Sequence, residues 1–380
     1  MKIKMNRAGK MSTFSLLAAM TLAGTNVAAQ TVQWDGGGDG INWEDPLNWA
    51  GDVLPGPANL AFNSGAANTV PGNVTLNSDQ EVDALRFVRG RDLNHIGGTL
   101  TIGTSGLNNA GNPLDRTESS FPEFGDDGGT GIYTMSNGAT YNQIDGGLFI
   151  LGRAGTQGGQ LFMSDNALMT TNGQLWFGMD AVFSGVVSDN ATVQITNGGN
   201  MEIGRFVSPS STLTFQDNAN LQINGTLRMS QGTGGGVSGD STLRLEGSSL
   251  DIDIDGLIMR ELATLEFIAD VGGISTIDLG GAIELLDDGG GLAPQLVVDL
   301  SLYSGTGPIT LIDNTTLDAV NGEFRGLSEG AVVAGTGGLT ISYVGGDGND
   351  IVLIPEPASL ALLAMGGLLM TTRRRRESVN

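Results

Sequence analysis

The chain has 380 residues, no cysteine and a formal net charge of −23 at pH 7. Its 61 glycines exclude a mainly helical protein, because each glycine weakens a helix interior by ~1 kcal/mol relative to alanine. The acidic balance disfavours nucleic acid as a partner, and the lack of cysteine excludes disulfides and thiolate metal sites.

Residues 1–29 have the pattern of a secretory signal peptide. Basic residues lie within the first ten positions, an apolar stretch runs from Phe14 to Ala23, and small residues follow at Val27–Ala29. We expect cleavage after Ala29 and an exported mature chain. Because all three lysines leave with this segment, residues 30–357 carry ten arginines against forty acids, a net charge of −30.

Residues 30–130 are expected to form a tryptophan-rich N-terminal cap and the first coils of a repeat. Trp34, Trp43 and Trp49 fall close together and precede Pro55-Gly56-Pro57 and Ala61-Phe62. This series resembles the start of autotransporter-like β-helix surface proteins, in which it opens a solenoid. We favour a structural cap, because large aromatic side chains cover an open first coil well. The alternative is a glycan-binding site in which these three indoles stack on sugar rings.

Residues 131–354 carry an internal repeat of strands and turns. Turn motifs begin at intervals of 28, 24, 28 and 30 residues, and apolar residues alternate between them with period two. The motifs are Ser136–Thr140, Ser164–Leu168, Ser188–Thr192, Gln216–Asn220 and Glu246–Leu250. The sequence therefore predicts an all-β fold, a right-handed parallel β-helix of about twelve coils. An array of β-sandwiches is the alternative.

Two acidic segments have the appearance of calcium motifs. Asp251, Asp253 and Asp255 open like an EF-hand loop, but the twelfth position is Leu262 instead of glutamate. Residues 345–353 match one copy of a calcium-binding β-roll nonapeptide, which needs stacked copies to share ions. We expect a solvated strand face at the first segment and a tight turn of the final hairpin at the second. No metal ligands are assigned, and calcium is the alternative.

The candidate catalytic residues do not form a recognisable catalytic pattern. His95 is the only histidine and follows a polar stretch from Arg89, so we interpret it as a surface residue. The acid pairs Asp126-Asp127 and Asp287-Asp288 lie in glycine-rich sequence that predicts turns, without neighbouring groups that would adjust a carboxyl pKa for catalysis. We therefore expect no enzyme activity, although β-helix polysaccharide lyases and hydrolases make it an alternative.

Residues 355–380 read as a sorting segment. Pro355, Glu356 and Pro357 precede an apolar run, and four arginines follow it: Arg373, Arg374, Arg375 and Arg376. An apolar run with cationic residues behind it inserts as a helix and stops with its C-terminus in the cytoplasm. This tail resembles the PEP-CTERM sorting signal of Gram-negative bacteria that make extracellular polysaccharide. An ordinary transmembrane anchor is the alternative.

The resemblance to PEP-CTERM proteins implies a membrane enzyme of the exosortase type as a partner and only transient membrane insertion of the C-terminal helix. We expect a non-catalytic structural protein of the cell envelope, cell surface or extracellular matrix, associated with exopolysaccharide or biofilm. Extracellular polysaccharide and other surface proteins are the expected ligands. The first alternative is a glycan-binding adhesin, and the second is a polysaccharide lyase or hydrolase.

Overall fold

The computed structural model describes residues 30–57, 59–63, 73–87, 91–103, 123–124, 130–144, 146–153, 158–206, 210–232, 239–287 and 292–356. The expected signal peptide at 1–29 lies outside these residues. So do Pro357, the apolar run and the arginine tail.

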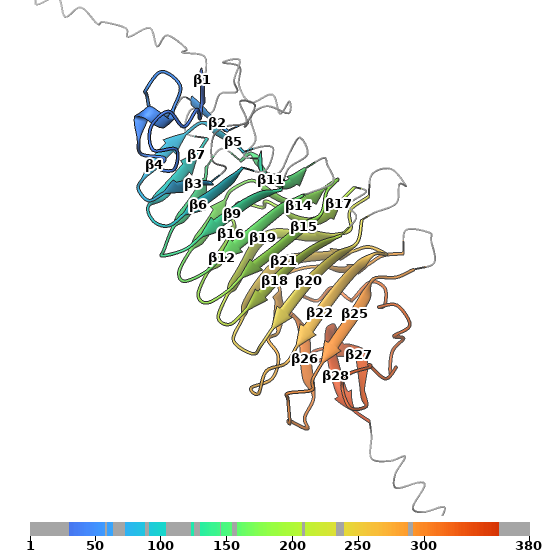
Figure 1. The fold of residues 1–380 in the computed structure, drawn as a ribbon. Helices are drawn as coiled ribbons and strands as arrows, with labels where there is room; N and C mark the ends of the chain where they lie inside the picture. Colours follow the sequence, from blue (N-terminus) through green and yellow to red (C-terminus); the bar gives the residue numbers. More distant parts are fainter. Residues whose placement is uncertain are drawn as a thin grey trace, which may run out of the picture.

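The described chain is all-β: 28 strands and one short 3-10 helix, η1 (Pro46–Asn48), follow one another along a rod (Figure 1). Successive turns of the chain place parallel strands beside one another, so the prediction of a parallel β-solenoid is confirmed and the β-sandwich array is wrong. Each turn contributes one strand to each of three parallel stacks, which we call faces 1, 2 and 3 in chain order.

Face 1 is a nine-stranded sheet. Its strands are β3 (Asn73–Leu76), β6 (Asp92–His95), β9 (Gly131–Met135), β12 (Gly159–Met163), β15 (Phe183–Val187), β18 (Ser211–Gln216), β20 (Ser241–Glu246), β22 (Ala263–Ile268) and β25 (Gln295–Asp299). Face 2 contains β4 (Gln80–Val82), β7 (Thr99–Ile102), β10 (Thr140–Gln143), β13 (Leu168–Thr171), β16 (Thr192–Ile195), β23 (Ile277–Leu279) and β26 (Ile309–Asn314).

Face 3 contains β1 (Gln30–Gln33), β2 (Asn59–Asn63), β5 (Ala84–Phe87), β8 (Glu123–Phe124), β11 (Leu148–Arg153), β14 (Gln174–Met179), β17 (Met201–Arg205) and β24 (Ile283–Leu285). Two long strands, β19 (Asn220–Met229) and β21 (Asp251–Met259), join face 2 to face 3 because their first halves pair in one stack and their second halves in the other.

The core follows from period-two alternation. In β9, β12 and β15 every second residue is buried, so one side of each strand packs inward. Parallel pairing in register then stacks like positions on like positions. One inward column of face 1 contains Tyr133, Leu161, Gly185, Leu213, Leu243, Leu265 and Leu296. Each turn buries its apolar residues only against its neighbours, as stacked repeats do.

The repeated turn motifs form the edge between faces 1 and 2. Asp165, Asp189 and Asp217 adopt left-handed backbone conformations there, with φ of 59°, 57° and 61°. Aspartate tolerates this region better than most residues. An oxygen of each of these carboxylates accepts a hydrogen bond from the turn before: Asn137 N to Asp165 at 3.0 Å, Asp165 N to Asp189 at 3.1 Å, and Asp189 N to Asp217 at 3.4 Å. We call these three residues the aspartate ladder.

The corner between faces 2 and 3 requires glycine for a different reason. A Cβ at Gly199 would lie 1.9 Å from the carbonyl oxygen of Gly173, and a Cβ at Gly225 would lie 2.0 Å from that of Gly199. Adjacent turns therefore approach too closely at this corner for any side chain.

Both ends of the rod are covered. At the N-terminal end, Trp43 and Trp49 have no exposed surface and Trp34 is 3% exposed; the Nε1 of Trp49 donates to the carbonyl oxygen of Trp43 at 2.8 Å. At the C-terminal end, β27 (Leu339–Gly345) and β28 (Asp350–Pro355) form an antiparallel hairpin beside β26 (Figure 1). The expected tight turn and final hairpin are confirmed.

The solenoid has about eight turns, so the expectation of about twelve coils is wrong. Twelve coils would require that every residue from 30 to 354 belong to a coil. In the structure, residues 34–57 form the N-terminal cap, and residues 315–338 form turns and isolated bridges beside the last strands.

Candidate functional site

Face 3 carries a groove built from outward side chains of neighbouring strands. Register places Ile150 of β11 beside Trp176 of β14, then Glu202 of β17, then Arg228 of β19. The groove encloses about 470 Å³ and is lined by Gly146, Gly147, Leu148, Ile150, Arg153, Gln174, Trp176, Met179, Glu202, Arg205, Arg228 and Gln231. It is the largest concentration of mixed aromatic, cationic and amide groups among the described cavities.

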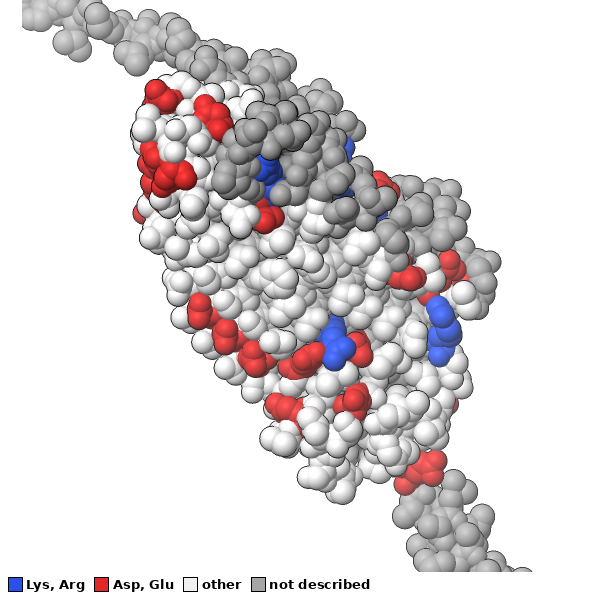
Figure 2. Space-filling model, in the orientation of Figure 1, with Lys and Arg blue, Asp and Glu red and all other residues white. Residues whose placement is uncertain are grey.

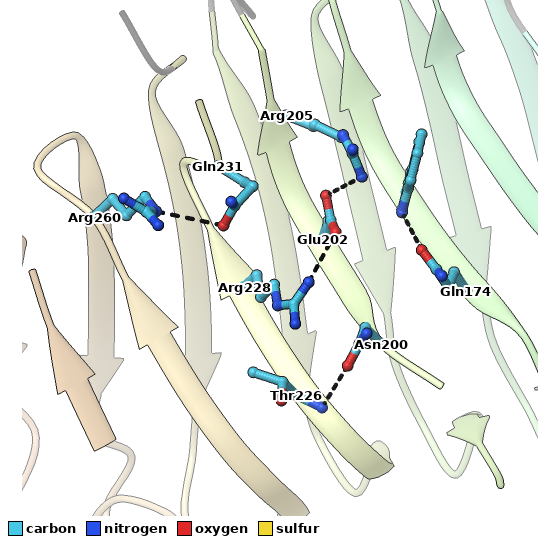
Figure 3. Close-up of polar contacts among 9 residues, drawn as sticks. Gln174, Asn200, Glu202, Arg205, Thr226, Arg228, Gln231 and Arg260 are labelled. Atoms are coloured by element: carbon cyan, nitrogen blue, oxygen red, sulfur yellow. Dashed lines mark hydrogen bonds and ion pairs between the residues drawn. The ribbon is translucent and has the colours of Figure 1, made fainter. Parts of the chain in front are cut away.

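Arg205 contacts two aromatic rings and a carboxylate. Its Cζ lies 3.6 Å from the centre of the Trp176 ring and 4.8 Å from the centre of the Phe206 ring. Its Nη1 donates to Glu202 Oε2 at 2.7 Å (Figure 3). Aromatic contacts and an ion pair therefore fix the guanidinium before any ligand arrives.

Glu202 forms ion pairs with two arginines, Arg205 and Arg228. Its side chain is 2% exposed, and its Oε1 lies 3.7 Å from Arg228 Nη1 on the next strand (Figure 3). Burial raises the pKa of this carboxyl, while the charges of Arg205 and Arg228 act in the opposite direction.

Amide side chains extend the polar surface on both sides of the arginines. The Nε1 of Trp176 donates to Gln174 Oε1 at 3.1 Å, and Arg260 Nε donates to Gln231 Oε1 at 3.4 Å. Asn200 Oδ1 accepts from the backbone N–H of Thr226 at 3.0 Å and so supports the floor beside Glu202 (Figure 3). The site offers hydrogen-bond donors and acceptors next to an indole ring.

Acidic groups outnumber basic groups in residues 30–357. Figure 2 shows acidic side chains in a row along one long edge of the rod, with few basic side chains on the visible face. On face 1, Arg244 lies 3.3 Å from Glu266 and also pairs with Glu246, so this cation is neutralised by two acids. The groove differs because three arginines line it together with one carboxylate.

The three N-terminal tryptophans do not present ring faces to solvent. Trp34 and Trp43 both pack edge-on against Trp49, at ring-centre distances of 5.0 and 4.8 Å. Because all three are buried, a sugar cannot stack on them in this arrangement. The described tryptophan with an accessible surface is Trp176, which the sequence did not suggest as a site residue.

His95 is buried, so its interpretation as a surface residue is wrong. It is the last residue of β6, has no exposed surface, and its Nδ1 lies 3.2 Å from the hydroxyl of Tyr133. Burial lowers its pKa to about 4. The polar residues Asp92 and Asn94 alternate with Leu93 and His95, and this short period-two pattern places the histidine inward.

The acidic strand agrees with its solvated interpretation. Asp251, Asp253 and Asp255 are exposed on β21, while Ile252 and Ile254 are buried. Asp253 stands in register with Asp278 on the next turn. Within the residues that the structure describes, no group of three or more His, Asp or Glu side chains is arranged to hold a metal ion. Asp126, Asp127 and Asp288 lie outside the described residues.

Of the sorting motif, Pro355 ends β28 and Glu356 follows it, and both are exposed. Pro357 and Arg373, Arg374, Arg375 and Arg376 lie outside the described residues. In the part of the chain that is described, no helix has the length and apolar character needed to cross a membrane.

Sequence reasoning missed the groove, although the repeat contained a signal. Leu148–Gly152, Leu175–Gly178 and Met201–Gly204 are equivalent segments of successive turns, and in each the residue between two core residues is on the groove side of its strand. Aligning them places Ile150, Trp176 and Glu202 in one column. The flanking Arg205 and Arg228 then fall beside that column.

The fold and the groove define the class of this protein, a capped parallel β-solenoid with a polar, partly aromatic groove on one side. No protein-family model matches the chain, and comparison with curated proteins and with solved structures gives no match.

Proposed function

We propose that this protein is a non-catalytic structural component of the cell surface or extracellular matrix, exported and then sorted by an exosortase-type enzyme. The observation that supports it best is the covered solenoid: tryptophans pack over the first coil and an antiparallel hairpin lies beside the last. Covered ends suppress edge-to-edge strand pairing, so the rod stays a discrete spacer. We also propose that the solenoid is right-handed. Residues 355–380 are proposed to supply a helix that inserts into the membrane transiently.

The sorting part is tested in cells by replacing Pro355, Glu356 and Pro357 with alanine. We expect the variant to stay in the membrane fraction with its Arg373–Arg376 tail intact, while the wild-type protein leaves the membrane without that tail. Mass spectrometry of the mature C-terminus measures the difference. Release of the alanine variant at the wild-type rate, or an intact tail on the released wild-type protein, would contradict exosortase processing.

A glycan-binding adhesin is the second candidate, and the groove on face 3 favours it. Trp176, the arginines and the amides of Gln174 and Gln231 are the kinds of side chains that hold sugar rings and hydroxyl groups. Glycoside hydrolysis uses a pair of carboxyl groups, and among the residues that line this groove Glu202 is the one carboxylate. We therefore assign glycan binding to this groove, and no glycoside hydrolysis.

A glycan array and an assay for released uronate, both on the exported protein, separate these functions. Binding without turnover supports the adhesin, turnover supports an enzyme, and neither supports a purely structural role.

A further inference from the structure

The groove on face 3 reverses the sign of charge that prevails in this protein. Residues 30–357 contain forty acids and ten arginines, yet Arg153, Arg205 and Arg228 line one groove with a single carboxylate, Glu202. Low-dielectric walls focus the field of such a cluster, so the groove attracts anions. Because acidic side chains repel anions from other parts of the surface, an anion is directed to this groove.

Two of the three arginines, Arg205 and Arg228, contact Glu202. Trp176 and Glu202 fix Arg205, and Glu202 also lies 3.7 Å from Arg228, whose side chain is 35% exposed. The Nε of Arg205 is buried, so a ligand oxygen would contact this guanidinium through its Nη atoms. Pre-organised guanidinium groups bind carboxylates with little loss of side-chain entropy.

The cations are spaced along the rod. Arg153 and Arg205 occupy the same register column with Met179 between them, so they stand two strands apart, roughly 10 Å. Arg228 follows on the strand after that of Arg205. A single small anion needs only one of these groups, whereas a linear chain with repeated anionic groups contacts several of them at once.

The backbone around the groove argues against an extended peptide. β14 is paired on one side with β11 and on the other with β17, and β17 is paired in turn with β19. Peptides that bind as strands gain affinity from main-chain hydrogen bonds at a sheet edge, and these strands are interior. An occupant is therefore held by side chains alone: guanidiniums for its acidic groups, and amides with an indole ring for hydroxylated rings.

We propose that the groove on face 3 binds a carboxylate-bearing polysaccharide, a linear chain of acidic sugars lying along the rod axis. This inference rests on the proposed export of the protein, which brings the groove into contact with extracellular polysaccharide. Arg153 and Arg228 pair with carboxylates, Arg205 provides the fixed central cation, and Gln174 and Gln231 contact hydroxyl groups.

The test measures binding of the mature exported protein to polygalacturonate by calorimetry, with a chelator present so that divalent cations cannot bridge two acidic polymers. Fully methyl-esterified polygalacturonate is the matched neutral ligand. We expect saturable binding of the acidic polymer, none of the esterified polymer, and at least a tenfold loss of affinity in the double variant Arg153→Gln, Arg228→Gln. The slope of log affinity against log salt should also fall in that variant.

Arg244→Gln is the control, because it removes one positive charge from face 1 and leaves the groove intact. It should bind like the wild type, and equal melting temperatures of all variants establish that each is folded. Equal binding of acidic and esterified polymers, or unchanged affinity of the double variant, would overturn the proposal. So would tighter binding of polyglutamate or of a single-stranded oligonucleotide.

Failure of this inference is distinguishable from failure of the proposed function. The double variant retains Pro355, Glu356 and Pro357, so its export and processing should match the wild type. Normal export without polymer binding rejects the inference alone. Polymer binding by a protein that is never exported in cells rejects the proposed function.

Discussion

The Cζ of Arg205 lies 3.6 Å from the centre of the indole ring of Trp176, on the neighbouring strand of face 3. The indole attracts the cation and also limits its movement, an interaction worth about 0.5–2 kcal/mol. Glu202 accepts a hydrogen bond from the Nη1 of the same arginine. The indole ring, the guanidinium and the carboxylate therefore form one unit across two turns of the solenoid. Substitutions at either strand are therefore expected to affect the whole unit.

Glu202→Gln is expected to stabilise the protein at pH 7 and to leave its stability unchanged well below pH 4.5. Burial raises the pKa of Glu202 above its ordinary value of 4.5, so the folded state favours the protonated carboxyl. The contribution of this carboxyl to stability is present in acid and is lost as pH rises through the raised pKa. Glutamine resembles the protonated form at every pH. Urea unfolding of both proteins at several pH values measures the difference, and a less stable variant at pH 7 would show that the arginines outweigh burial.

His95 is expected to give the fold a sensitivity to acid. Burial lowers its pKa from 6.5 to about 4, so stability due to the neutral ring is complete above pH 6.5 and is lost as pH falls towards 4. At ~1.36 kcal/mol per pH unit this loss amounts to about 3 kcal/mol. His95→Leu should lose this component of the pH dependence whatever its absolute stability. An unchanged pH profile of unfolding in the variant would contradict the assignment.

Gly199→Ala is expected to destabilise the solenoid strongly, because its Cβ would lie 1.9 Å from the carbonyl oxygen of Gly173 on the preceding turn. The two turns must separate to admit it, so we expect a loss of more than about 3 kcal/mol. Gly138→Ala is the matched control: its φ is 74°, but nothing lies within 4 Å of its Cβ. That variant should lose only ~1–2 kcal/mol from backbone strain. Thermal unfolding of the two variants separates the cost of a steric clash, in Gly199→Ala, from the cost of backbone strain, in Gly138→Ala.

Asp189→Ala is expected to cost ~1–3 kcal/mol. Its carboxylate accepts the backbone N–H of Asp165 at 3.1 Å, and its own φ is 57°, where alanine is strained. Asp189→Asn keeps an acceptor oxygen and a residue that tolerates the left-handed conformation, so it should stay within about 1 kcal/mol of the wild type. Equal losses in the two variants would mean that charge, and not turn geometry, makes the aspartate ladder stabilising.

Trp49→Ala is expected to open the N-terminal end of the rod at a cost of ~3–5 kcal/mol. The indole is fully buried between Trp34 and Trp43 and donates to the Trp43 carbonyl oxygen. Leu47→Ala in the adjoining η1 is the control, since Leu47 is half exposed and should change stability by less than about 0.5 kcal/mol. Hydrogen exchange of β1, β2 and β5 locates the effect; unchanged protection of these strands would remove the capping role.

The repeat could be predicted because its causes are local. Alternation in the segments that became β18 and β20 specifies strands with one inward side, and Asp-Asn pairs that recur every 24 to 28 residues specify turns that accept left-handed residues. The alternation of Asp251, Asp253 and Asp255 with isoleucine likewise settled which side of β21 is solvated. By contrast, the number of turns depended on which residues cap the ends, and spacing alone does not reveal this.

By itself the sequence determined that this chain stacks short strands, carries an excess of acid and turns at aspartate, asparagine and glycine, because each of these depends on a residue and its immediate neighbours. Only the tertiary structure decided that Trp176, Glu202 and Arg228 share a groove and that His95 lies inside. Trp176, Glu202 and Arg228 are more than twenty positions apart, and the four residues of β6 alternate over too short a stretch to outweigh the polar residues that precede His95. Their contacts exist because parallel register brings successive turns to about one strand spacing.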